Sequence, residues 1–210
     1  MSITDTLSSL AASLVPPIHF LLYSTLLGTE LYQSFFMTKV CFVALPRSAF
    51  TTLQKRVFPI YFRAQAGLLF LVALTFPARA NQADDAGRWL ASAIPLSAGH
   101  KSDWIPFAVA GLTSVLNLVV YEPRTRMAMV ERIHQETRDA KRRAVTNEND
   151  GHKSHGLTIG ESSGPSDEMR RLNRLFSKNH AMSIHLNLVS MGAMLLYGLR
   201  LASRLNLEAV

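Results

Sequence analysis

Four long apolar runs constrain the fold of this chain more than any other feature. They lie at 18–42, 58–76, 104–121 and 182–201. At a rise of about 1.5 Å per residue, each run is long enough to cross about 30 Å of hydrocarbon. Backbone groups inside a bilayer must be hydrogen-bonded within the chain, so the runs are expected to be helices. We therefore predict an all-α fold, a four-helix transmembrane bundle.

The stretches around these runs divide the chain into five parts. Residues 1–17 place leucines on one helical face and end at a Pro-Pro pair, which predicts an N-terminal interfacial segment. Residues 18–121 hold the first three spans. Residues 122–145 alternate acidic and basic side chains, which predicts a solvated, basic cytosolic helix. Residues 146–166 contain little to bury and are predicted to form a disordered linker. Residues 167–210 hold an amphipathic lead-in and the fourth span.

The positive charge is concentrated in two connections, 44–57 and 122–179, which hold most of the 22 lysines and arginines. In a four-span chain these two connections lie on the same side, and basic residues favour the cytosol. We predict that both face the cytosol and that both termini face away. The formal charge of +7 then orients the protein and attracts anionic lipid headgroups.

The expected partners are therefore membrane lipids, and a homo-oligomer is compatible with the sequence. No nucleic-acid reading motif accompanies the charge, so nucleic acid is not an expected partner. We expect no cofactor and no resident metal. Neither run length nor charge bias identifies which membrane holds the protein.

Glu30 is the only acidic residue in the apolar stretch from Ile18 to Phe36. A charged side chain at the centre of a membrane helix costs roughly 2.5–3.5 kcal/mol on the insertion scale. Such a group needs a partner, a proton or a water-filled cleft, and it marks a candidate functional site.

Polar side chains recur on one face of each run. In the first run, for example, His19 and Glu30 differ by only about 20° in azimuth at about 100° per residue. We predict that the polar faces converge inside the bundle and form one polar seam, which contains His19, Glu30, Arg63, Asn117, His180 and Asn187.

Three interpretations of this seam remain open. The polar groups could have only a structural role, in which they form hydrogen bonds between helices. They could instead relay an ion or a small solute, with Glu30 gaining and losing a proton; a soft-metal variant of this interpretation uses Met37, Cys41, Met191, Met194 and His180. The third interpretation is an intramembrane enzyme, but the chain carries no recognised catalytic motif, so we predict a protein that is not an enzyme.

Several segments together resemble a known family. They are Leu45–Phe50, which reads LPRSAF; Val57–Phe62, which reads VFPIYF; Asn117 ahead of Glu122–Thr125, which reads EPRT; and Phe176 ahead of His180 and Asn187. Their order and spacing resemble the transmembrane protein 205 family of small four-span membrane proteins. The resemblance implies a four-helix membrane domain and brings no established reaction.

The recurrent polar positions of that family fall here on His19, Gly28, Arg47, Gln54, Tyr61, Asn117, Glu122, Arg124, His180 and Asn187. Glu30 departs from the pattern, because an uncharged amide is usual at its position. Arg47 and Arg124 lie near the cytosolic ends of spans one and three, with Glu122 beside them. We predict that these three residues form an interfacial ion pair or a site for a lipid phosphate.

The favoured function is transport, export or tolerance of a small solute, metal or drug through the seam around Glu30. The alternative is a non-catalytic membrane scaffold or adaptor that recruits partners through the basic helix at 122–145.

Overall fold

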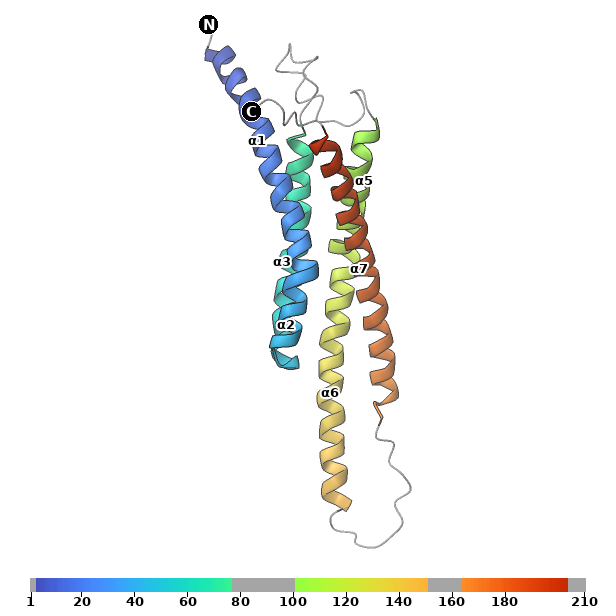
Figure 1. The fold of residues 1–210 in the computed structure, drawn as a ribbon. Coiled ribbons are helices and arrows are strands. Elements are labelled where there is room, and N and C mark those ends of the chain that lie inside the picture. The colour runs from blue at the N-terminus through green and yellow to red at the C-terminus, as the bar shows by residue number, and fades with distance from the viewer. Residues whose placement is uncertain (1–2, 77–100, 151–163, 204–210) are drawn as a thin grey trace. The chain divides into compact units, whose positions relative to one another are not determined.

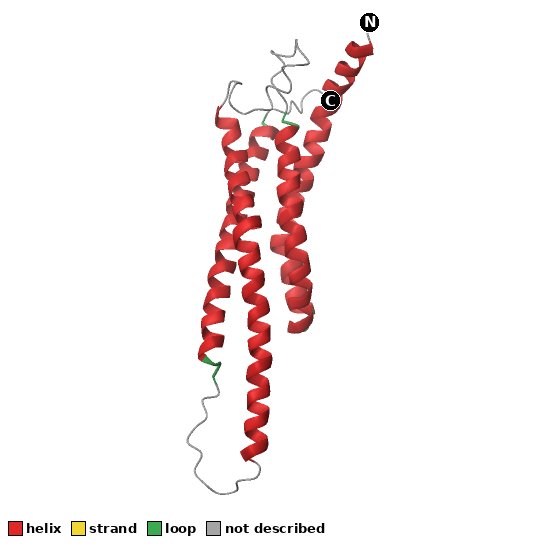
Figure 2. Cartoon of the chain, turned by 180° about the vertical axis from the view of Figure 1, so that it is seen from behind, coloured by secondary structure: helices red, strands yellow, loops and turns green. Residues whose placement is uncertain are grey.

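The computed structural model describes residues 3–76, 101–150 and 164–203 (Figure 1). Within these ranges every regular element is a helix, as Figure 2 shows, so the all-helical prediction is confirmed there. The elements are α1 (Ile3–Leu31), the π-helix η1 (Tyr32–Met37), α2 (Thr38–Ala44), α3 (Arg47–Leu74), α5 (Lys101–Leu116), the π-helix η3 (Asn117–Tyr121), α6 (Glu122–Asp150) and α7 (Asp167–Ala202).

Three helices in the described part of the chain are long and apolar enough to cross a membrane. They are Arg47–Leu74, the continuous helix Trp104–Val145 and Asp167–Ala202. The first predicted run, 18–42, is not among these three helices. A helical membrane bundle is therefore plausible, whereas four spans are not established by these helices.

The helix boundaries differ from the predicted ones at three places. α1 passes through Pro16 and Pro17, whose rings lie on an exposed face, and does not stop there. The predicted connection 44–57 is almost entirely helical, because α3 already begins at Arg47. α6 continues to Asp150, past the predicted end of the basic helix at 145. The rest of the predicted linker, 151–163, lies outside the described residues.

The turn between α2 and α3 follows from one proline. Leu45 precedes Pro46 and is extended, with φ −108° and ψ 144°, because the proline ring disfavours a helical conformation in the residue before it. The Leu45 N–H still donates to the carbonyl of Cys41, at 3.1 Å, and so closes the last turn of α2. Pro46 itself has φ −55° and leads directly into α3.

The chain divides into two compact units, residues 1–119 with 185–210 (unit 1) and residues 120–184 (unit 2). An aromatic layer holds the helices of unit 1 together near one end. The ring centroids of Phe107 and Tyr197 are 4.5 Å apart, those of Tyr23 and Tyr197 are 5.4 Å apart, and those of Phe76 and Phe107 are 5.6 Å apart. Tilted and edge-to-face rings at these distances stabilise packing beyond their buried area. The layer thus joins α1, α5 and α7 with Phe76, two residues beyond α3.

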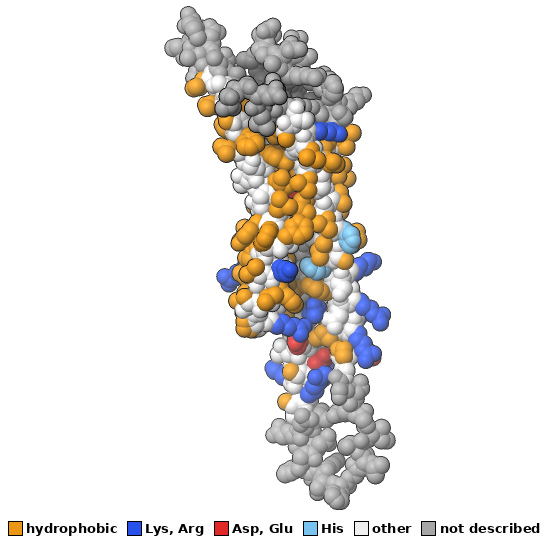
Figure 3. Space-filling model, viewed as in Figure 1, with side chains coloured by type: hydrophobic (Ala, Val, Ile, Leu, Met, Phe, Trp, Pro, Cys, Tyr) orange, Lys and Arg blue, Asp and Glu red, His pale blue; other side chains and the backbone are white. Residues whose placement is uncertain are grey.

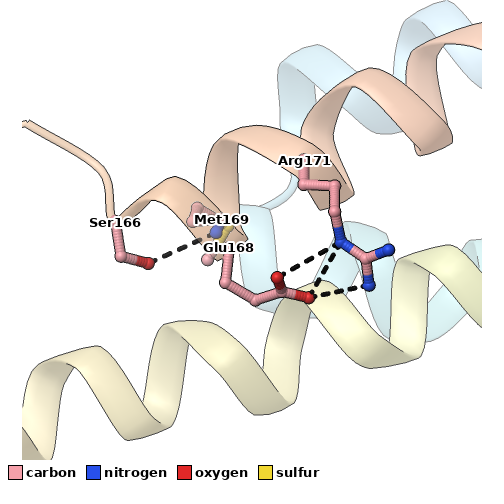
Figure 4. A network of polar contacts seen from close by, with 4 residues as sticks. All are labelled: Ser166, Glu168, Met169 and Arg171. Carbon is pink, nitrogen blue, oxygen red and sulfur yellow. Dashed lines mark hydrogen bonds and ion pairs between the residues drawn. The ribbon is translucent and has the colours of Figure 1, made fainter.

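Unit 2 is a pair of polar helices, and in Figure 3 its visible side chains include many lysines and arginines. Ser166 caps α7, because its Oγ accepts a hydrogen bond from the Met169 N–H at 3.2 Å and donates one to Asp139 of α6 at 2.7 Å. Figure 4 shows this cap beside the ion pair of Glu168 and Arg171, which are 2.9 Å apart. The guanidinium of Arg132 also lies over the ring of Phe176, 4.7 Å from its centroid.

Candidate functional site

Glu30 is fully buried at the centre of unit 1, with 0% of its side chain exposed. Its Oε1 accepts a hydrogen bond from Gln65 Nε2 at 2.6 Å and another from the Ser190 hydroxyl at 3.1 Å. The three residues come from α1, α3 and α7. One carboxyl group therefore ties three helices together.

The hydrogen bonds continue from Gln65 to a second buried amide, Asn187. Its Oδ1 accepts from the Tyr61 hydroxyl at 2.7 Å and from Gln65 Nε2 at 3.2 Å. Its Nδ2 donates to the Ser34 hydroxyl at 2.9 Å. We call this set the Glu30 network; it comprises Glu30, Ser34, Tyr61, Gln65, Asn187 and Ser190.

The Glu30 network lacks hydrogen-bond donors. Glu30 Oε2 and Gln65 Oε1 are both buried and accept no hydrogen bond from any described residue. A buried acceptor without a donor is costly, and a buried charge is more costly still. A proton on the carboxyl group would remove the charge and supply a donor.

The contact between Glu30 and Gln65 suits either protonation state. An ionised carboxylate accepts from the amide nitrogen, as drawn at 2.6 Å. That distance is short for N–H···O and typical of O–H···O. If the Gln65 amide is reversed, its oxygen takes the nitrogen's place and accepts from a protonated carboxyl group. Amide orientation is assigned from the hydrogen-bond pattern, so the heavy-atom positions alone do not fix the protonation state of Glu30.

A π-helix begins beside the network on α1. η1 starts two residues after Glu30, and the Thr38 hydroxyl donates to the Gln33 carbonyl five residues earlier, at 2.9 Å. Such wide turns are frequent at functional sites. A second π-helix, η3, opens at buried Asn117.

Asn117 lies at about the depth of Glu30. Phe107 contacts Tyr197, which also contacts His19. Asn117 is ten residues beyond Phe107 in its helix, a rise of about 15 Å. Glu30 is eleven residues beyond His19 in α1, a rise of about 16 Å. Both π-helices therefore open at the same level of unit 1.

His19 belongs to a separate polar group at the aromatic end of unit 1. Its Nε2 lies 2.5 Å from the Tyr197 hydroxyl and its Nδ1 lies 3.1 Å from Thr75 Oγ1. Thr75 already donates its proton to the Leu71 carbonyl at 2.8 Å. Each ring nitrogen of His19 therefore has a hydroxyl partner, and the tautomer of the ring decides which group donates in each pair.

The described contacts do not join His19 to the Glu30 network. Buried apolar residues lie at the intermediate levels, among them Leu26, Leu69 and Val72. In place of one predicted seam, unit 1 thus contains two separate polar groups, one around His19 and the other the Glu30 network.

The prediction that Arg63 belongs to the polar seam is wrong. It is exposed on α3, whereas Tyr61 and Gln65 are buried. The physical reason is helical periodicity, because Arg63 lies about 200° around the helix from both neighbours. Tyr61 and Gln65, four residues apart, share the interior face. That spacing could have identified Gln65 from the sequence, whereas nothing in the apolar pattern singles out Ser190.

Of the predicted interfacial site only the ion pair is corrected, and a site for a lipid phosphate at Arg47 and Arg124 stays a prediction. Arg47 and Arg124 are both exposed. Glu122 instead pairs with Arg126 of its own helix, with 3.0 Å between Nε and Oε1, because one helical turn brings the two side chains together. His180 lies in unit 2, where its ring stacks on Phe176 at 5.3 Å.

The predicted soft-metal residues are placed as follows. The Cys41 thiol donates to the Met37 thioether at 3.1 Å within α1–α2. Met191 and Met194 are buried in unit 1, and Met194 belongs to its apolar core. In the described ranges, no three His, Cys, Asp or Glu side chains gather as metal ligands.

Three helices that are long and apolar enough to cross a membrane suggest a multi-pass helical membrane protein. Residues 21–134 match the model of a family described as a domain of unknown function, DUF4149. The chain is also 34% identical over 204 residues to the xanthocillin biosynthesis cluster protein D of Aspergillus fumigatus, across 97% of this chain and 96% of the relative. The chain belongs to the DUF4149 family. No solved structure matches it.

Proposed function

We propose that this protein moves a small solute or ion across a membrane, with the protonation of Glu30 coupled to the movement. The observation that carries the proposal is the buried Glu30 carboxyl group, which has one oxygen hydrogen-bonded twice and the other without a partner among the described residues. Intramembrane carboxyl groups on polar networks are characteristic of proton relays in pumps and transporters.

The proposal includes four spans. α1, η1 and α2 together form the fourth, beside the three long apolar helices. The resemblance to the transmembrane protein 205 family supports this number, although neither comparison names that family. The excess of basic residues at 44–57 and 122–179 supports a cytosolic position for both segments, with membrane lipids as partners.

Two states of the Glu30 network supply the coupling step. In the ionised state, Gln65 donates to the carboxylate. In the protonated state the carboxyl group donates to the Gln65 oxygen, and the Asn187 amide reverses as well to keep its contact with Gln65. Ser34 and Tyr61 serve either orientation of Asn187, because a hydroxyl group can donate or accept. A proton thus reorganises contacts among three helices.

The name of the relative suggests the biological setting. That name places the relative in a biosynthesis cluster. For a membrane protein in such a setting we propose export of, or tolerance to, a small product. We propose the same kind of role here, with no catalytic step assigned to the chain.

The test is proton entry into liposomes that contain the purified protein and a pH-sensitive dye. Under an imposed pH gradient, the wild-type protein is expected to acidify the lumen faster than empty liposomes do. Glu30→Gln keeps the shape of the side chain but cannot ionise, so it should abolish this flux. Glu131→Gln removes an exposed acid on α6 and should leave the flux unchanged. Equal rates for wild type and Glu30→Gln would refute the proposal.

The alternative is a membrane scaffold that recruits partners through α6. The observation that favours it is the run of exposed basic residues near the end of that helix, namely Arg138, Lys141, Arg142 and Arg143. For a scaffold, replacing these four residues by glutamine abolishes the cellular phenotype while Glu30→Gln is silent. The transport proposal predicts the reverse.

A further inference from the structure

α3 carries two arginines on its exposed side, within an otherwise apolar stretch. Arg56 and Arg63 are seven residues apart, which places them about 10 Å apart along the helix and within about 20° in azimuth. Both are exposed. No acidic residue in the described part of the chain forms an ion pair with either one.

Apolar and small residues continue the same side of α3. Ile60 is 65% exposed and Phe70 is 67% exposed. Gly67 is also exposed, and a Cβ added there would meet nothing within 4 Å. With the two arginines these residues lie within about 80° of one another. We call this surface the Arg56–Arg63 face; it comprises Arg56, Ile60, Arg63, Gly67, Phe70 and Leu74.

Arg63 lies deep in the apolar part of α3. From Leu74, about 30 Å of hydrocarbon reaches back roughly 20 residues, to near Arg56. Arg63 therefore lies about 10 Å inside the boundary at which Arg56 sits. A lone guanidinium on the lipid-facing side of a span is costly. Its long stem can extend toward the helix N-terminus, the direction in which side chains tilt, and so bring the charge toward the level of Arg56.

We propose that the Arg56–Arg63 face binds one anionic phospholipid, whose phosphate lies between the two guanidinium groups. Arginine presents paired donors that match phosphate oxygens, so one phosphate can accept from both guanidinium groups at the boundary. The acyl chains then lie along Ile60, the open surface at Gly67 and Phe70. Hydrophobic side chains cover much of the visible face of unit 1 in Figure 3, as contact with acyl chains requires.

The site is independent of the proposed transport function, because Arg56 and Arg63 lie on the side of α3 opposite Tyr61 and Gln65. The lipid would hold α3 at a fixed depth. Arg63 would then bind lipid, although its neighbours in the sequence, Tyr61 and Gln65, belong to the Glu30 network.

The test is native mass spectrometry of the delipidated full-length protein, titrated with phosphatidic acid or, as the zwitterionic comparison, phosphatidylcholine. Wild type should bind one phosphatidic acid at least about tenfold more tightly than phosphatidylcholine, as a charge-assisted hydrogen bond implies. Arg63→Gln should remove this preference. Gly67→Leu fills the open surface and should weaken binding without changing the charge. The control Arg170→Gln, an exposed arginine of unit 2, should bind as wild type does.

Four results would overturn the proposal. The first is equal affinity of the wild type for both lipids. The second is an unchanged preference in Arg63→Gln, provided that this variant elutes as a monodisperse species. The third is a change of oligomeric state in Arg63→Gln with lipid binding intact, which would assign the face to a second copy of the chain. Millimolar inorganic phosphate should not displace the lipid; displacement would show that only a free anion is recognised.

Discussion

Gly198 of α7 lies where no larger residue fits, because Tyr23 of α1 occupies the space beside it. A Cβ added at Gly198 would lie 1.8 Å from the Tyr23 hydroxyl oxygen and 2.8 Å from its Cζ. Tyr23 cannot simply move away, since it is 7% exposed and its hydroxyl donates to the Met194 carbonyl at 3.1 Å. The Gly198→Ala variant should therefore be destabilised.

The magnitude follows from three contributions. Overpacking a filled core costs about 1–3 kcal/mol. Loss of the hydrogen bond between Tyr23 and Met194 adds about 1 kcal/mol. The higher helix propensity of alanine returns about 1 kcal/mol. The net loss in the free energy of unfolding is thus about 1–3 kcal/mol.

Gly192 supplies the matched control on the same helix. A Cβ there meets nothing within 4 Å, so Gly192→Ala should be neutral or stabilising by up to about 1 kcal/mol. Reversible unfolding in mixed micelles, followed by circular dichroism, measures both variants. Adding Tyr23→Phe to Gly198→Ala removes the nearest clashing atom, so the double variant should lose less stability than the sum of the two single variants. If Gly198→Ala is as stable as Gly192→Ala, the packing argument is wrong.

Two further predictions concern single hydrogen bonds. Tyr61→Phe removes the bond to Asn187 and should cost about 0.6 kcal/mol, the average for such pairs in membranes, whereas Tyr32→Phe at an exposed position should cost nothing measurable in the same micelle assay. Ser166→Ala removes the cap of α7 and should cost about 1 kcal/mol, seen as faster amide exchange in the first turn of α7. Exposed Ser177→Ala is its control, and equal exchange in the two variants would exclude a capping role.

The sequence predicts the helical class well, because long apolar runs in a bilayer allow few alternatives to helices. It also singles out Glu30, since an acid stands out in an apolar run. The partners of Glu30 are harder to predict. Gln65 follows from its spacing to Tyr61, but Ser190 is an ordinary small residue until α7 is placed beside α1. The rotational setting of each helix decides these contacts, and packing against the other helices determines it.

The helix boundaries show a second limit of the sequence. The Pro16-Pro17 pair, which closes the predicted interfacial segment, lies inside α1, and Pro59 lies inside α3. A proline removes one hydrogen bond, and packing of the remaining residues can compensate for that loss. The π-helices are not visible in the sequence either, because they depend on which side chains must face the interior on both sides of the wide turn.

The two wide turns, η1 and η3, have a consequence for how the chain tolerates changes in length. A π-helical turn holds one residue more than an α-helical turn. Removing a single residue from Tyr32–Met37 would therefore convert the π-turn to an α-turn and leave the helix beyond it in nearly the same position. An equal deletion within α3 would rotate everything beyond it by about 100°. Natural variants that lose one residue should therefore accumulate at η1 and η3 and be rare elsewhere in the core helices.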